Sequence, residues 1–291
     1  MITRPITRRF VLAGAGAALA TPSRARPSFA DLPAEWARIE AGSGGRLGVA
    51  VLDTGTGARA GHRAGERFPL CSTFKVLAAS AVLARVDAGA ERLERRVPIT
   101  PSDLVEHAPA TKEHVGTGMT LAELCEAAIT LSDNTAGNLL LGAVGGPAGL
   151  TAYARGLGDD LTRLDRTETA LNEALPNDPR DTTTPAAMLE NLNRLVLGSA
   201  LSPGSRGHLT GWLIANRTGD ARLRAGFPGW RVGDKTGTGE RGTANDVAVL
   251  WPPSGAPVVV TVYLTGASGT GEARNAVIAA VGRSVAAALS D

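Results

Sequence analysis

The spacing of apolar residues changes along the chain and divides it into strand-like ends and a helix-like middle. Near both ends, apolar side chains alternate with others or run continuously over short stretches, which is typical of strands. In the middle they recur at intervals of three and four, which is typical of helices. The predicted strands are 46–53, 230–234, 244–251 and 258–265. The predicted helices are 31–41, 74–86, 121–131, 185–197 and 272–289.

The order of these elements predicts an α/β fold of the α+β type. Because strands lie on both sides of a long helical stretch, we expect them to form one antiparallel sheet flanked by the terminal helices. We expect residues 31–70 and 217–291 to form this α/β domain, and residues 71–216 to form an inserted all-helical domain. The two domains are expected to meet at a cleft.

The composition is that of a folded globular protein and excludes some classes of function. Of the 291 residues, 43% are hydrophobic and 20% are charged. The net charge is +2 and basic residues are interleaved with acidic ones, so we expect no nucleic-acid partner. The four histidines are scattered without a zinc-ligand spacing, so no metal site is predicted. We also expect no cofactor.

The first 30 residues are predicted to be a secretory signal peptide and not part of the fold. The pair Arg8-Arg9 precedes a short apolar run over 11–20, and small residues follow. The pair suggests twin-arginine export, with cleavage after Ala20 or Ala30. The apolar run is too short to cross a bilayer, which needs about 20 residues. We therefore expect a periplasmic or secreted protein with no membrane association after cleavage.

Lysine is rare in this chain and stands where an amine could do chemistry. The 30 basic residues comprise 27 arginines and three lysines. Arginine is permanently charged, whereas the pKa of a lysine moves readily on burial. Lys75 follows Ser72 by three positions, and Lys235 opens a Lys-Thr-Gly triplet. Lys112 lies in a polar stretch, and we interpret it as an ordinary solvated charge.

Ser72 and Lys75 form the first candidate catalytic pair. A serine is a weak nucleophile unless a nearby base takes its proton. Residues three apart on a helix share a face, so the lysine could contact the serine. Taken alone, the spacing also fits a capped helix with a surface lysine.

Two further motifs offer hydrogen-bonding groups to a ligand. Ser132 and Asn134 flank Asp133 after the predicted helix 121–131. They fit a proton relay and a substrate contact, or simply a helix stop and an N-cap for the next helix. The run 235–239 (KTGTG) places a lysine and two hydroxyls on a strand, with glycines that let a ligand approach the backbone. Such an edge could bind a carboxylate and donate an N–H to an oxyanion.

Glu168 and Asn172 lie in a polar run that we expect to form a compact Ω-loop. A carboxylate held inside such a loop could position a water as general base. Taken alone, a glutamate and an asparagine four apart most often form a surface pair. The expected ion pairs across the base of the loop are Arg166–Asp181 and Arg163–Asp178.

Together and in this order, the four motifs resemble the class A serine β-lactamases, over essentially the whole mature chain. The resemblance implies hydrolysis of the β-lactam ring of penicillins and cephalosporins through a serine acyl-enzyme, and hence antibiotic resistance. It also implies small-molecule substrates and a monomer. A DD-peptidase and a β-lactam sensor or trap share several motifs. Glu168 and Asn172, which the resemblance assigns to deacylation, argue against both.

The resemblance implies a role for each motif residue. Ser72 is the nucleophile, and the backbone N–H groups of Ser72 and Thr238 form the oxyanion hole. Lys75 and Glu168 share the general-base work, and Glu168 is the base for deacylation. Ser132 passes a proton to the departing ring nitrogen. The implied substrate-binding residues are His107, Asn134, Asn172, Arg222, Lys235, Thr236 and Thr238.

Some substrate-binding positions depart from the pattern of the family. Many members bind the substrate carboxylate with an arginine where this chain has Ala244. Arg222 matches an alternative arginine that other members use, although taken alone it also fits a surface arginine. His107 stands where an aromatic ring usually lines the mouth of the site, which could alter substrate fit.

The two cysteines each match half of a disulfide found in the family. Cys125 has Ala79 at its partner position, and Cys71 has Gly239. We therefore expect two buried free thiols. The second mismatch also removes one reason to predict carbapenem hydrolysis.

Overall fold

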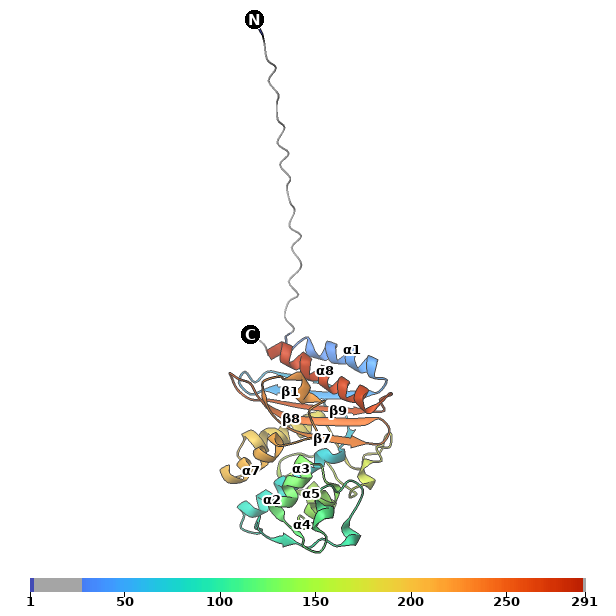
Figure 1. Ribbon diagram of the computed structural model, residues 1–291, viewed down its shortest axis with the longest axis vertical. Helices are drawn as coiled ribbons and strands as arrows, with labels where there is room; N and C mark the ends of the chain where they lie inside the picture. The colour runs from blue at the N-terminus through green and yellow to red at the C-terminus, as the bar shows by residue number, and fades with distance from the viewer. Residues whose placement is uncertain (3–27, 290–291) are drawn as a thin grey trace.

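The computed structural model describes residues 1–2 and 28–289 (Figure 1). The predicted signal peptide, residues 1–30, therefore lies almost wholly outside the described residues, and the twin-arginine pair lies outside them too. Within the described ranges, no helix is both long and apolar enough to cross a membrane.

Five strands form the central antiparallel sheet, in the order β2-β1-β9-β8-β7. Their bounds are β1 Arg46–Asp53, β2 Arg59–His62, β7 Arg231–Gly239, β8 Thr243–Trp251 and β9 Val258–Thr265. The first strand pairs with the last along its whole length, from Arg46 opposite Thr265 to Asp53 opposite Val258. The predicted fold class, α/β with one antiparallel sheet, is confirmed.

The two faces of the sheet belong to two separate hydrophobic cores. Val49 and Val51 of β1 pack in one core with α1 and α8, which lie together over the sheet in Figure 1. Ala50 and Leu52 of the same strand belong to the other core, which includes α6. Successive side chains of one strand therefore point alternately into the two cores. The covering helices are α1 Leu32–Ser43, α6 Pro185–Leu192 and α8 Gly271–Leu289.

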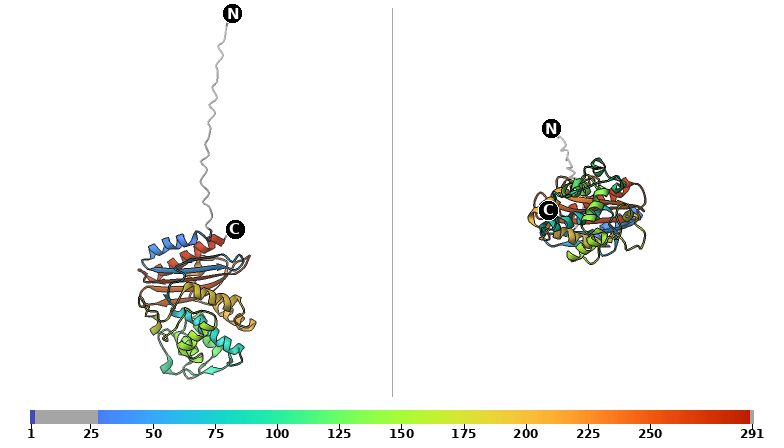
Figure 2. Two further views of the ribbon diagram at one scale, coloured as in Figure 1. Left: turned by 180° about the vertical axis from the view of Figure 1, so that it is seen from behind. Right: turned by 90° about the horizontal axis from the view of Figure 1, so that it is seen from below.

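A second group of helices packs in the same core as α6, on the side of the sheet away from α1 and α8 (Figure 2). Its members are α2 Phe74–Asp87, α3 Leu121–Thr130, α4 Asn134–Ala143, α5 Gly146–Gly156 and α7 Pro203–Ile214. Helix α2 is central, because every residue from Phe74 to Leu83 is buried and the other four helices all contact it. The start of α2 therefore has a fixed position between the helices and the sheet.

The middle of the chain also holds short strands that the apolar pattern did not predict. Strand β3 (Phe68–Pro69) pairs with β6 (Thr182–Thr183), and β4 (Arg96–Val97) pairs with β5 (Met119–Thr120). Strands of two residues are too short to carry a periodic signal. The predicted helix over 185–197 is divided, because α6 ends at Leu192 and a π-helical turn spans Asn193–Leu197.

Strand β7 extends to Gly239, so it includes the run 235–239 that was predicted to lie on it. This second half of the strand is polar and rich in glycine, so the apolar alternation by itself marked the strand only as far as Asp234. Pairing with β8 continues to its end, where Gly239 lies opposite Thr243. Because β7 is an edge strand, its second half can offer backbone groups to a ligand.

Candidate active site

The predicted site residues converge on one cavity of about 570 Å³ at the edge of β7. The start of α2, the loop before α4, the loop that carries Glu168, and β7 all contribute to its walls. The predicted residues that line it are Ser72, His107, Ser132, Asn134, Asn172, Arg222, Thr236 and Thr238. Lys75, Glu168 and Lys235 are buried and reach this lining through hydrogen bonds.

Ser72 lies in a single 3₁₀ turn, Cys71–Thr73, immediately before α2. Its hydroxyl accepts a hydrogen bond from Lys75 Nζ at 2.9 Å and donates one to Glu168 Oε1 at 3.1 Å. Lys75 Nζ and Glu168 Oε1 are themselves 2.9 Å apart. Because Ser72 Oγ donates to a carboxylate and lies beside an amine, this spacing meets the first geometric condition for an activated nucleophile.

Lys75 is enclosed on all sides and has no exposed side-chain surface. Its Nζ also donates to Ser132 O at 2.9 Å and to Asn134 Oδ1 at 2.6 Å. Burial lowers the pKa of Lys75, while the charge of Glu168 acts in the opposite direction. Gly137 on α4 permits this close packing, since a Cβ there would lie 2.7 Å from Lys75 Cε.

Asn138 holds Glu168 in place, although the sequence analysis did not single it out. Its side chain donates to Glu168 O at 2.9 Å and accepts from Glu168 N at 2.8 Å. Asn172 Nδ2 donates to Glu168 Oε2 at 2.5 Å, and Glu168 is only 4% exposed, so the two do not form a surface pair. The signal for Asn138 was its place four residues after Asn134, which puts both on one face of α4.

The loop that carries Glu168 is closed at its base by Arg166 and Asp181, as predicted. Arg166 Nε donates to Asp181 Oδ2 at 2.6 Å, and the backbone N–H of Arg166 donates to Oδ1 at 2.9 Å. The Asp181 side chain is 1% exposed. Solvent therefore screens this pair less than it screens a surface ion pair.

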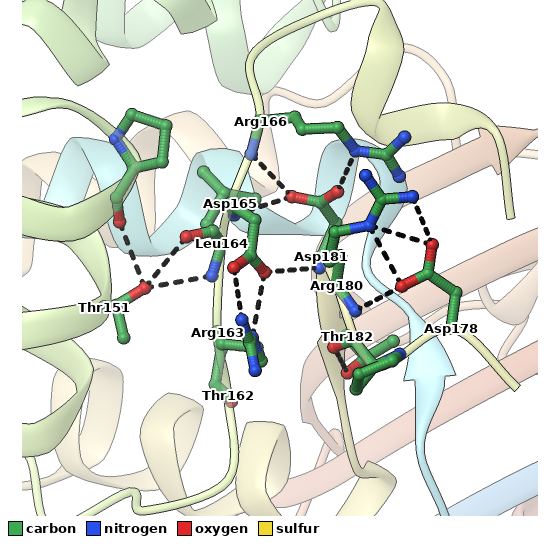
Figure 3. A network of polar contacts seen from close by, with 12 residues as sticks. Thr151, Thr162, Arg163, Leu164, Asp165, Arg166, Asp178, Arg180, Asp181 and Thr182 are labelled. Carbon is green, nitrogen blue, oxygen red and sulfur yellow. Dashed lines mark hydrogen bonds and ion pairs between the residues drawn. The ribbon is translucent and has the colours of Figure 1, made fainter.

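The second expected pair across the loop is wrong. Arg163 binds Asp165, and Asp178 binds Arg180 through two nitrogens of its guanidinium (Figure 3). Each arginine thus pairs with a carboxylate two residues away. An ion pair between residues two positions apart costs less conformational entropy than a pair across the loop, because less chain has to be ordered.

Ser132 receives a hydrogen bond from each of the two buried lysines. Lys235 Nζ donates to Ser132 Oγ at 2.9 Å, while Lys75 Nζ donates to its carbonyl oxygen. Burial lowers the pKa of Lys235 well below its usual value, and the positive charge of Lys75 lowers it further. Ser132 is therefore placed to exchange a proton with an amine.

Asp133 supplies the N-cap of α4. Its carboxylate accepts from Ala136 N at 2.8 Å and from Thr111 N at 2.9 Å. The N-cap interpretation of this motif therefore holds for its middle residue, while Ser132 and Asn134 line the cavity. Capping also fixes the direction in which α4 presents Asn134.

Arg222 reaches β7 from the turn that precedes the strand. Its guanidinium donates to Gly237 O, Asn245 O and Thr238 Oγ1, each at 2.7 Å. Arg222 is 8% exposed, so it is not a surface arginine. Together with Lys235 it places two cations beside the polar half of β7.

Comparison with known proteins decides the family. Residues 31–289 match the Beta-lactamase enzyme family. The β-lactamase L2 of Stenotrophomonas maltophilia is 48% identical over 296 residues, which cover 97% of this chain and 98% of that protein. A solved ancestral (GNCA) class A β-lactamase is 66% identical, with a TM-score of 0.87, covering 88% of this chain and 98% of that one. The chain belongs to the class A β-lactamases. The predicted family and enzyme class are therefore confirmed, and the protein is a serine hydrolase of β-lactams.

His107 of this β-lactamase lies at the cavity, at the position where the resemblance led us to expect an unusual side chain. Its Nε2 is 3.0 Å from Leu131 O. Its own carbonyl oxygen accepts from Asn134 N at 2.9 Å. The imidazole is thus tied to the loop before α4, and the backbone of His107 helps to hold Asn134.

Both cysteines of this β-lactamase are buried free thiols, as expected. Cys71 directly precedes Ser72, and burial raises the pKa of its thiol. A Cβ at Gly239 would lie 2.7 Å from Cys71 Sγ, so Gly239 is within bridging distance of this cysteine but has no side chain. Cys125 lies in the core around α3.

Proposed function

We propose that this β-lactamase opens its substrate with Ser72, and that water positioned at Glu168 then hydrolyses the acyl-enzyme. The observation that carries the proposal is the position of Ser72 Oγ, which hydrogen-bonds to both Lys75 Nζ and Glu168 Oε1. A serine held between a carboxylate and an amine can lose its proton as it attacks. The carboxylate then remains in place for the second step.

In acylation, Ser72 Oγ attacks the lactam carbonyl carbon while its proton passes to Lys75 or Glu168. Burial lowers the pKa of Lys75, which favours the neutral amine that can accept a proton. Negative charge develops on the carbonyl oxygen and is stabilised by the backbone N–H groups of Ser72 and Thr238. Both residues line the catalytic cavity.

Ser132 then delivers a proton to the ring nitrogen as the carbon–nitrogen bond breaks. This role is supported by the two lysines that contact it, one at the hydroxyl and one at the carbonyl oxygen. Lys235 holds the hydroxyl in position for the transfer, and Lys75 fixes the backbone of Ser132 through its carbonyl oxygen. Lys75 and Lys235 also stabilise the alkoxide character of Ser132 during the transfer.

The substrate carboxylate binds along the polar half of β7. Lys235, Thr236 and Thr238 offer one cation and two hydroxyls there, and Arg222 adds a second cation through its contact with Thr238 Oγ1. Asn134 binds the side-chain amide of the substrate. His107 borders the substrate at the mouth of the cavity.

Deacylation uses Glu168 together with Asn172. The Asn172 amide nitrogen donates to Glu168, while Asn172 Oδ1 is a buried acceptor without a partner among the described residues. That oxygen can accept from the hydrolytic water while Glu168 removes the other proton. Asn138 fixes the position of the Glu168 carboxylate by hydrogen-bonding to the backbone of Glu168.

The proposal extends to the setting in which the enzyme works. It acts as a monomer on penicillins and cephalosporins, outside the cytoplasm, after twin-arginine export. The support is the basic and apolar pattern of residues 1–30 and the resemblance to the family. We include the division into an α/β domain (31–70 and 217–291) and a helical domain (71–216) in this proposal.

The test is to remove the deacylating carboxylate. Wild-type enzyme should turn over a chromogenic cephalosporin many times, whereas Glu168→Ala should react once and retain a stable added mass by intact-mass spectrometry. Glu113→Ala is the matched control, because the side chain of Glu113 is 72% exposed and lies outside the cavity. Steady turnover by Glu168→Ala, or one burst and then silence from the wild type, would refute the proposal.

A further inference from the structure

A second cavity, of about 650 Å³, lies on the other side of the loop that carries Glu168. Its walls are the second half of that loop, the strand ends at Arg46 and Thr265, and the turn at Arg241. Asn172 lines the catalytic cavity and Ala174 lines the second one, so a strip of loop separates the two. We name this second space the loop cavity.

The charged side chains of the loop cavity leave it with unbalanced positive charge. Arg46, Arg67 and Arg241 face two carboxylates, Glu66 and Asp178. Both carboxylates already have partners, since Arg46 and an arginine outside the cavity bind Glu66, and another outside arginine binds Asp178. Arg46 pairs with Glu66 and Arg241 pairs with Glu240, so one lining arginine, Arg67, remains without a carboxylate partner among the described residues.

Arg67 is held by neutral partners. Its Nη1 donates to Leu161 O at 2.7 Å and to Thr182 Oγ1 at 3.1 Å. Across the part of the chain that the structure describes, no carboxylate lies within ion-pair distance of Arg67. The neutral partners hold one nitrogen of the guanidinium and do not neutralise its charge.

Part of the rest of the lining is apolar, beside the polar residues Asn177, Thr182 and Thr265. Pro69 lies on one side, and Leu175, Pro176 and Pro179 lie on the loop. Leu175 is half-buried, and Pro176 and Pro179 are exposed. A space of this size with apolar walls and a few placed polar groups is typical of a site for a small molecule.

We propose that the loop cavity binds a small amphipathic carboxylate. The carboxylate pairs with Arg67, and the apolar part of the ligand packs against Leu175 and its neighbouring prolines. An arginine fork matches a carboxylate because it can offer two parallel N–H donors. The inference stands apart from the catalytic roles proposed above, because binding here is measurable without turnover.

A ligand in the loop cavity touches the chain close to the catalytic groups. Ala174 and Leu175 come two and three residues after Asn172, and Arg241 Nη1 donates to Glu173 O at 2.6 Å from the opposite wall. Binding to the folded loop stabilises that loop by mass action. We therefore expect slower exchange of the amide hydrogens of Ala174, Leu175, Asn177 and Asp178 when the cavity is occupied.

The experiment is a titration of the purified protein with phenylacetate, followed by backbone amide NMR. Saturating shifts are expected at the amides of Ala174, Leu175, Asn177 and Asp178, and at Gly266, which lines the opposite wall. Phenylacetamide, which has the same apolar part without the charge, should not bind. Inorganic phosphate, which has charge without an apolar part, should bind more weakly than phenylacetate.

Two kinds of variant test the predicted contacts. Arg67→Gln should weaken phenylacetate binding roughly tenfold or more, the loss expected for one charge-assisted hydrogen bond. Arg59→Gln is its control, because Arg59 is an exposed arginine outside the cavity. Leu175→Glu should repel the carboxylate and bind phenylacetate more weakly than Leu175→Gln, which removes the same apolar contact without adding a charge. This second pair keeps the test decisive if Arg67→Gln fails to fold.

Several results would overturn the inference. Shifts confined to the amides of Ser132 and Thr238 would place phenylacetate in the catalytic cavity. Equal affinity in Arg67→Gln and wild type, or in Leu175→Glu and Leu175→Gln, would remove the proposed contacts. Binding of phenylacetamide or phosphate as tight as that of phenylacetate would show that the ligand class is wrong.

Discussion

Lys75 Nζ lies 2.9 Å from Glu168 Oε1, and neither side chain has any exposed surface. Removing one member of a buried ion pair leaves the other charge uncompensated, which typically costs about 3–5 kcal/mol. Substitutions at either residue therefore change folding as well as chemistry. Stability has to be measured beside activity in every variant of this pair.

The two buried lysines should respond differently to arginine. Lys75→Arg is expected to reduce acylation on the order of 10²–10⁴-fold, because arginine does not release its proton near neutral pH. Lys235→Arg should keep measurable turnover, since Lys235 supplies a positive charge to Ser132 and to the substrate carboxylate. Acyl-enzyme formation by mass spectrometry and steady-state penicillin hydrolysis check both. Equal losses would show that neither lysine is needed for its proton.

Arg222→Ala should weaken the binding of substrates that carry a carboxylate. The guanidinium holds Thr238 Oγ1 and the Gly237 carbonyl, so its loss removes a cation and loosens the edge of β7. We expect KM to rise roughly tenfold, with a smaller effect on kcat. Arg217→Ala, at an exposed position nearby, is the control. Unchanged kinetics in Arg222→Ala would mean that another cation binds the carboxylate.

The base of the loop should depend on Arg166 and not on Arg163. Arg166→Gln breaks a pair whose carboxylate, Asp181, is 1% exposed, so we expect a destabilisation of about 3 kcal/mol and faster proteolysis of the loop. Arg163→Gln removes a contact with its near neighbour Asp165 and should change stability by less than about 1 kcal/mol. Urea denaturation and limited proteolysis check both. A larger effect in Arg163→Gln would contradict the structure.

Asp246 should make the stability of the enzyme depend on pH. Burial and the neighbouring Asp234 raise the pKa of Asp246 well above 3.8, so the folded protein holds a proton that the unfolded chain releases. Its contribution to stability is complete below about pH 4 and is lost as pH rises through the folded pKa. In urea denaturation at several pH values, Asp246→Asn should reduce the slope of the free energy of unfolding against pH by up to ~1.4 kcal/mol per pH unit.

Asp220→Asn is the control for that measurement, because the Asp220 side chain is 82% exposed. It should leave the pH dependence of the free energy of unfolding unchanged. If Asp246→Asn and the wild type show the same slope, Asp246 is ionised in the folded enzyme.

Gly239→Cys should form a disulfide with Cys71. A Cβ at Gly239 lies 2.7 Å from Cys71 Sγ, near the spacing that a disulfide requires once the strand shifts slightly away from Asn172 O. Thiol titration of the denatured, unreduced protein should then find Cys125 alone, whereas the wild type shows both native thiols. Gly239→Ser controls for the side chain itself. Three reactive thiols in Gly239→Cys would contradict this geometry.

The apolar pattern predicted the fold where burial dictates the residue type. The strand at Val258–Thr265 is apolar on both faces because it lies between two cores, and its bounds match the prediction. The apolar pattern alone did not mark the second half of β7, which was placed on the strand from its motif, because a ligand-binding edge needs glycines and hydroxyls where a core strand would have apolar residues. Function there overrides the pattern by which strands are recognised.

The site could be predicted only as far as its motifs extend. Asn138 and Gly137 act through close contacts with Glu168 and Lys75, and such contacts depend on how α4 packs on α2. The spacing of residues along α4 does not show how this helix packs on α2. The wrong partner for Arg163 has the same origin, since a polar loop offers several carboxylates and backbone geometry selects among them.

The pairing of β1 with β9 bears on how the protein is made. During synthesis β1 emerges early, and of its two neighbours in the sheet, β2 follows soon after while β9 comes near the end of the chain. The helices around α2 can fold from local contacts in the meantime, whereas long-range strand pairing is slow. A nascent chain halted before β9 thus exposes an apolar strand that invites aggregation. The sheet of this enzyme therefore cannot be completed until β9, its last strand, has been synthesised.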